Sequence, residues 1–165
     1  LPCWAVMVTF EAPVPVDFGG AFLEGDPLSW VCRNTSQPGR PPEESWVLHG
    51  GPGWSETHLE RDPEEVAEML MGAFASRFGP LPDASFRRGH RWRYAQPRDA
   101  AGVDALHDAR LGIGVCGDAF PGGRVEGALL SGRAVAGRIL AQAPPAAANP
   151  LGEARPGTSE QLPLL

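Results

Sequence analysis

The spacing of apolar and β-branched residues predicts four strands in the first hundred residues. They cover 3–11, 29–34, 45–49 and 85–95. Each is bounded by glycine, proline or polar turn residues, as is typical of strands. The turn at 37–42 contains three prolines, and because proline lacks the backbone donor that a sheet needs, the turn cannot continue a strand. The strands on either side of it are therefore predicted to form an antiparallel pair.

A helix with one apolar face is predicted from 63 to 78. Asp62 is suited to the N-cap and Pro63 to the first helical position. Apolar residues then recur on one face at Val66, Met69, Leu70, Ala73, Phe74 and Phe78. Gly79 and Pro80 end the pattern. The helix is predicted to pack on the core and to carry no chemistry.

The strand at 85–95 separates its side chains into two faces. By alternation, one carries Phe86, Arg88, His90, Trp92 and Tyr94, and the other carries Arg87, Arg91 and Arg93. His90, Trp92 and Tyr94 are candidates for lining a substrate cavity, although a half-buried strand with a hydrogen-bonded histidine has the same pattern. The arginines are predicted to be solvated or paired with acidic residues rather than to bind nucleic acid.

The last ordered segment is predicted to be a strand at 111–116, a loop, and a helix at 124–141. The apolar stripe of that helix comprises Val125, Ala128, Leu129, Gly132, Val135, Ala136, Ile139 and Leu140. Its three internal glycines each cost about 1 kcal/mol relative to alanine, which predicts that a sheet or a ligand approaches it closely. Residues 142–165 are rich in proline and alanine and are predicted to be a disordered tail.

Gly112, Gly114 and Gly117 match the pattern G-x-G-x-x-G, but we do not interpret them as a dinucleotide-binding fingerprint. That motif needs its glycines in the turn that opens a helix, and here the helix is predicted to begin seven residues after Gly117. Asp118 follows the strand directly, where ligands of open α/β sheets collect. The amides at the start of the helix at 124–141 can bind an electron-rich group.

Composition narrows the function classes. The 165 residues carry 20 acidic and 14 basic side chains, a net charge of −6, which argues against nucleic acid or an anionic membrane as partner. All basic residues are arginine, which excludes Schiff-base chemistry and a P-loop lysine. The three cysteines are widely spaced and the histidines lack ligand spacing, so we expect no metal and a cytoplasmic protein. No apolar run approaches the roughly 20 residues that span a bilayer.

Several segments together resemble the FAD-dependent amine oxidase superfamily, in particular its renalase-like branch of NAD(P)/FAD-dependent oxidoreductases. They are 30–41, 46–49, 54–55, 63–78, 90–95, and the strand–loop–helix string 112–118 with 122–128 and 131–132, which is similar to the family's second flavin motif. The resemblance runs over residues 1–141 in the family's order. It implies an α+β fragment in which 1–110 form part of an antiparallel-sheet substrate domain. Residues 111–141 then form the last strand and helix of an FAD-binding Rossmann domain.

The resemblance also implies function and site residues. A reduced organic small molecule is expected to transfer a hydride to FAD. The implied cofactor-binding residues are Gly117, Asp118, Gly123, Arg124, Val125 and Glu126, with Asp118 near the ribityl–diphosphate region and the amides of 124–126 facing the pyrimidine edge of the ring. No catalytic residue is assigned.

The family's N-terminal G-x-G-x-x-G does not occur in these residues. Because the chain opens directly on a strand pattern, we expect it to be the C-terminal half of a longer enzyme, inactive without an N-terminal FAD-binding half. Alternatives remain open: Gly117 and Asp118 can form a simple turn, Arg124 and Glu126 can simply cap a helix, and the whole chain can be a non-catalytic α+β binding domain that has lost its cofactor site.

Overall fold

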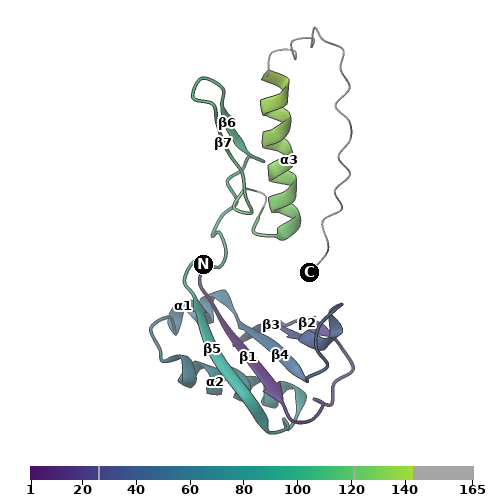
Figure 1. Ribbon diagram of the computed structural model, residues 1–165. Helices are drawn as coiled ribbons and strands as arrows, with labels where there is room; N and C mark the ends of the chain where they lie inside the picture. Colours follow the sequence, from purple (N-terminus) through teal and green to yellow (C-terminus); the bar gives the residue numbers. More distant parts are fainter. Residues whose placement is uncertain (26, 121, 143–165) are drawn as a thin grey trace, which may run out of the picture.

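A five-stranded antiparallel sheet, in the order β2-β3-β4-β1-β5, is the largest element of the fold (Figure 1). The computed structural model describes residues 1–25, 27–120 and 122–142. The strands are β1 (Cys3–Phe10), β2 (Gly20–Phe22), β3 (Leu28–Arg33), β4 (Ser45–Gly50) and β5 (Ala84–Trp92). The predicted antiparallel pair is confirmed as β3 and β4.

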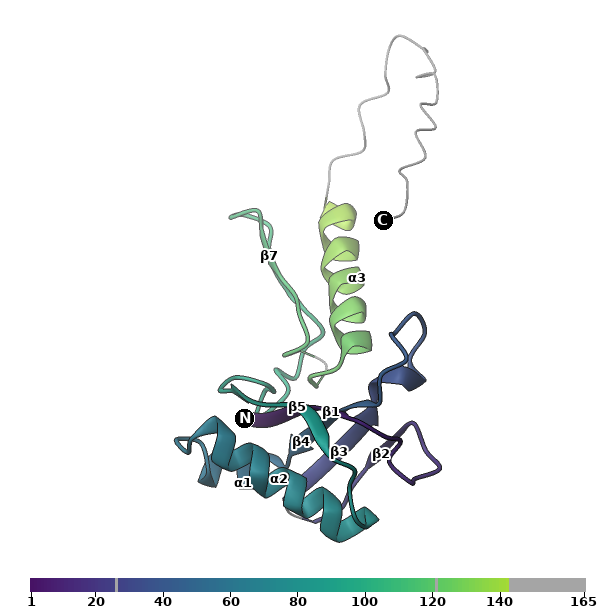
Figure 2. The same cartoon turned by 60° about the horizontal axis from the view of Figure 1, so that its bottom comes forward.

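One face of the sheet is covered by helix α2 (Pro63–Phe78), with the short helix α1 (Pro52–Thr57) beside it (Figure 2). The side chain of Asp62 accepts a hydrogen bond from the Glu64 amide, so the predicted N-cap is confirmed. The core consists of buried side chains from β1, β3, β4 and α2, among them Trp4, Val6, Val31, Trp46, Leu48, Leu70 and Phe74. The α+β class is thus confirmed.

The two faces predicted for the strand at 85–95 are confirmed in β5. Arg87 lies on the α2 side, where its guanidinium pairs with Glu64 and Glu68. Gly89 follows on that same side, and a Cβ built there would lie 2.2 Å from the Pro63 carbonyl oxygen. The start of α2 therefore packs directly on the β5 backbone, while no helix of the described residues covers the opposite face of β5.

A hairpin and a helix form the second part of the structure. Strands β6 (Leu106–Asp108) and β7 (Ile113–Val115) pair antiparallel, and α3 (Val125–Gln142) runs beside them (Figure 1). The strand predicted at 111–116 is too long, because Gly112 lies in the hairpin turn with a φ of 65°. This left-handed conformation suits glycine and interrupts an extended strand.

The apolar stripe predicted for the last helix is wrong for most of its members. Helix α3 turns Gly127, Ser131 and Val135 inward, whereas Val125 and Leu140 are 90% and 74% exposed. Packing against a two-stranded hairpin selects this narrow face, because Gly114 has no Cβ and lets Val135 approach its backbone. Ile139 also reaches the Gly114 backbone but stays about half exposed, and no described element covers Val125, Leu129 or Leu140.

Four elements were not predicted, because they are too short to show a periodic spacing of apolar residues. They are β2, β6, α1 and the 3₁₀ turn Asn34–Ser36. The predicted tail lies outside the described residues except for Gln142, which ends α3. The boundary at residue 110 between the two predicted domains stays a prediction. In the described part of the chain, no helix combines the length and the apolar character needed to cross a membrane.

Replacing Gly89 with alanine tests the close approach of α2 to β5. The added methyl group collides with the Pro63 carbonyl, and we expect a loss of about 1–3 kcal/mol in the free energy of unfolding. Urea unfolding of both proteins measures it. Gly72→Ala is the matched control: its site on α2 has nothing within 4 Å and should gain about 0.5–1 kcal/mol. Equal stability of Gly89→Ala and the wild type would contradict the packing argument.

Candidate functional site

The loop between β7 and α3 is closed on itself at the start of the helix. The Gly123 amide donates to the Asp118 carbonyl at 2.7 Å, and the Phe120 amide donates to the Gly117 carbonyl at 3.4 Å. Gly122 and Gly123 have φ values of 98° and 77°, which L side chains rarely adopt. The glycines therefore allow the chain to reverse tightly before α3.

Ser131 ties this loop to the middle of α3. Its hydroxyl is buried, donates to the Asp104 carbonyl, and accepts from the Gly117 amide at 3.1 Å. Arg138, two turns further along, donates to the Ala105 carbonyl and pairs with the Asp104 carboxylate. The sequence places Ser131 in the string that resembles the flavin motif, but predicts no role for its hydroxyl. The feature of the sequence that indicates its buried position is its spacing. Ser131 stands four positions from both Gly127 and Val135 and therefore lies on the same face of the helix as they do.

A cavity of about 700 Å³, called here the loop cavity, lies where this loop meets the sheet. The loop side contributes Gly123, Arg124 and Val125, and the sheet side includes Trp30 and His49. A neighbouring pocket of about 630 Å³ shares Gly123 and Arg124. The structure thus brings three of the predicted cofactor-binding residues to one cavity.

The other three predicted cofactor-binding residues do not line either of these pockets. The Gly117 amide is bound by Ser131, Asp118 is exposed in the loop, and Glu126 is exposed in the first turn of α3. Asp118 acts on the loop through its backbone, because its carbonyl closes the turn. The exposed carboxylate remains available to a ligand that approaches from solvent.

A second cavity, of about 590 Å³ and called here the sheet cavity, lies on the uncovered face of β1, β4 and β5. Its lining residues are Ala5, Met7, Val47, His49, Phe86, Arg88, His90 and Trp92. His90 and Trp92 line it as the alternation predicts, with their ring centroids 4.6 Å apart. Tyr94 lies beyond the end of β5, is 94% exposed and borders only a smaller pocket beside Trp92.

His49, which was not among the predicted site residues, lines both the loop cavity and the sheet cavity. Its ring lies 4.8 Å from that of Trp30. Burial lowers its pKa from the ordinary value of 6.5, so the imidazole is neutral at pH 7. The available signal is the alternation in β4, where Trp46 and Leu48 are buried in the core and His49 therefore faces the other way.

Strand register places a second imidazole on the same face. Ala5 in β1 is opposite His49 in β4 on one side and His90 in β5 on the other. Residues directly opposite one another in a sheet share a face. The two histidines therefore flank Ala5, and both line the sheet cavity.

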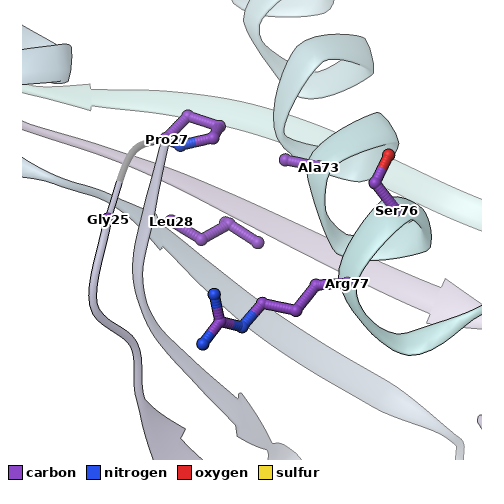
Figure 3. A pocket seen from close by; sticks show the side chains of 6 residues that line it. All are labelled: Gly25, Pro27, Leu28, Ala73, Ser76 and Arg77. Carbon is purple, nitrogen blue, oxygen red and sulfur yellow. The ribbon is translucent and has the colours of Figure 1, made fainter.

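A further pocket lies on the α2 side of the sheet, between the loop that precedes β3 and the end of α2 (Figure 3). Its volume is about 510 Å³, and its lining includes Leu28, Ala73, Ser76 and Arg77. The Arg77 guanidinium donates to the Glu24 carbonyl at 3.4 Å. Among the described residues that line it, no nucleophile lies beside a base, and we assign the pocket no chemistry.

Comparison with known families gives a match over most of the chain. The family model described as flavin containing amine oxidoreductase matches residues 2–140. The match includes the five-stranded sheet, the hairpin and α3 up to its last turn, and therefore every residue of the two cavities.

Removing the Ser131 hydroxyl should loosen the loop. In Ser131→Ala the Gly117 amide loses its acceptor and the Asp104 carbonyl its donor, which should cost about 1–3 kcal/mol. Hydrogen exchange at the Gly117 amide measures the effect locally. Ser76→Ala removes an exposed hydroxyl that bonds only to the Gly72 carbonyl within α2, so exchange at Gly117 should not change in that control. Unchanged exchange in Ser131→Ala would contradict the tethering role.

The environment of His49 can be tested by titration. Burial lowers its native pKa from 6.5, so on acidification the unfolded chain takes up this proton first. Stability is therefore expected to fall as the pH drops from about 6.5 toward the native pKa, and to become independent of this group below it. The NMR signal of the His49 ring should titrate at lower pH in the native chain than in the urea-unfolded chain. An equal or higher native midpoint would contradict the assigned burial.

Proposed function

This chain belongs to the family of flavin-containing amine oxidoreductases, and on that premise we propose that it forms the C-terminal half of a renalase-like, FAD-dependent oxidoreductase. In the proposed reaction a reduced organic small molecule gives up a hydride to the flavin. The observation that carries the proposal is the loop cavity, which is lined by Gly123 and the start of α3 on one side and by Trp30 and His49 on the other.

The residues of the loop cavity fit a flavin ring. The volume of about 700 Å³ lies within the usual range of small-molecule sites. The first amides of α3, from Val125 onward, have no acceptor within the helix and carry partial positive charge. Arg124 adds a full charge, and no carboxylate is among the described residues that line the cavity. Such a wall suits the electron-rich pyrimidine edge of the ring.

We assign the holding roles to Gly123, Arg124, Val125 and Glu126 through their backbone at the start of α3. Gly117 and Asp118 would bind the hydroxylated chain of the cofactor from the outer side of the loop. Asp118 is exposed there, and a carboxylate accepts hydrogen bonds from hydroxyl groups. When bound, FAD supplies the two-electron chemistry, while the protein binds and orients the substrate.

On the substrate side, we propose that His49 is the residue that handles a proton. Its neutral imidazole has one free ring nitrogen that can accept a hydrogen bond or a proton from a substrate N–H group. Trp30, Trp92 and His90 line the same cavities and offer flat rings to the substrate. Since His49 lines both cavities, a substrate in the sheet cavity can contact a ring in the loop cavity beside it.

We also propose that an N-terminal FAD-binding half covers the hairpin and α3. Ile113 and Val115 of β7 are about half exposed, and Leu129 of α3 is 66% exposed. An uncovered apolar surface next to an unpaired strand edge is typical of an interface. Three free cysteines, with no disulfide, favour the reducing cytoplasm as the compartment.

The alternative is a non-catalytic α+β binding domain. It is favoured by one observation: Asp118 and Glu126, two of the residues implied to contact the cofactor, do not line the loop cavity. The two functions differ in whether FAD binds when the FAD-binding half of a renalase-like relative is supplied.

The experiment is a titration of FAD into this chain alone and into the chain co-expressed with that half. We expect FAD to bind tightly only to the complex. In the complex, Asp118→Ala should raise the Kd for FAD by about 10- to 100-fold, because one charge-assisted hydrogen bond is lost. Flavin absorbance and fluorescence quenching measure the binding.

Asp99→Ala is the control, since Asp99 is equally exposed but lies outside the loop. It should leave the Kd unchanged. Absence of FAD from the complex would favour the binding domain. An unchanged Kd in Asp118→Ala, with the same loss of thermal stability with and without FAD, would show that Asp118 only shapes the loop.

A further inference from the structure

The arginines around β5 differ sharply in their partners. Arg87, on the α2 side, pairs with Glu64 and Glu68, and Arg91 and Arg93 both pair with Glu60. Arg88 lies on the other face and forms no ion pair with any residue in the described ranges. The chain thus neutralises the neighbouring guanidinium groups and leaves this one available.

The described residues around Arg88 are mostly apolar and include no acidic side chain. Arg88 lines the sheet cavity together with Met7, Val47, Phe86 and Trp92. Although the chain has a net charge of −6, no Asp or Glu is among the described residues that line this cavity. The rings of Phe86 and Trp92 are each about half exposed, so both offer surface to a flat ligand.

Strand geometry separates the two ends of this cavity. Strands rise about 3.3 Å per residue, so Arg88 lies roughly 13 Å from Trp92 along β5. The Trp92 end is next to His49, which borders the loop cavity, whereas the Arg88 end points away from it along the strand. A ligand that contacts both ends needs a planar part at the Trp92 end, facing the loop cavity. It also needs a charged group that reaches Arg88 at the other end.

From this arrangement we propose that Arg88 determines specificity: the substrate is a planar, largely apolar molecule that carries a carboxylate, and Arg88 binds that carboxylate. A guanidinium group matches a carboxylate through two parallel hydrogen bonds. Binding of such a molecule to the sheet cavity requires no flavin. Only its role as the substrate rests on the proposed function.

The test uses the full 165-residue chain and a matched pair of probes, 2-naphthoate and 2-naphthamide, titrated by ligand-observed NMR. The acid should bind about fivefold more tightly than the amide at low salt, the upper range for an exposed charge pair. In Arg88→Gln the two probes should bind equally. In the control Arg87→Gln, on the opposite face, the preference should persist. Added salt should reduce the preference, because the guanidinium is exposed.

Arg88→Lys gives a second measure. It retains the charge but loses the forked geometry, so it should keep part of the preference for the acid. Binding of neither probe, equal binding of both to the wild type, or a preference that survives Arg88→Gln would overturn the proposal. Failure of the reassembled complex to bind FAD would instead overturn the proposed function, and the naphthoate result would stand independently of it.

Discussion

The contact between the β5 backbone at Gly89 and the start of α2 determines how the rest of the sheet is used. With no room for a Cβ there, α2 lies directly on the sheet and buries Val66, Leu70 and Phe74 against the tryptophans of β1 and β4. All the large apolar burial is thus on one face. Within the described ranges no helix lies across the other face, which can serve ligands because a sheet in water needs only one buried face to be stable.

The charged side chains of β5 also differ between the two faces of the sheet. On the α2 side both arginines of β5, Arg87 and Arg91, form ion pairs with glutamates. Each such pair at the protein surface contributes little to stability. On the open side the strand presents Arg88 and His90 between aromatic and aliphatic residues. Among the described residues, the ionisable groups that line the sheet cavity of this acidic protein are therefore all basic or neutral, as they are in the loop cavity, which is the reverse of what its net charge suggests.

The hairpin and α3 obey a different constraint. Their own interface is narrow and depends on small residues and on one buried hydroxyl, that of Ser131. A two-stranded hairpin cannot bury a whole helix face, so large apolar side chains remain exposed on α3. This part of the chain therefore keeps large apolar side chains at its surface, which is the basis of our proposal that an FAD-binding half covers it.

The sequence by itself determined the elements whose patterns are long. The capped helix at 63–78 has the predicted bounds, β1, β3, β4 and β5 lie within two or three residues of theirs, and the two faces of β5 follow from alternation alone. Local chemistry suffices in these cases, because caps, turns and period-two patterns act between near neighbours in the chain. The resemblance at 112–128 likewise lies in contiguous residues.

Only the tertiary structure decided which of these residues meet. His49 and His90 are 41 positions apart and become neighbours through their shared partner Ala5, a consequence of register that no local pattern contains. The inward face of α3 was decided by what packs on it, so Ser131 is buried while Leu129 is exposed. Arg88 and Arg87 are alike in sequence, and they differ because folding brings α2 and its glutamates to one side of the strand only.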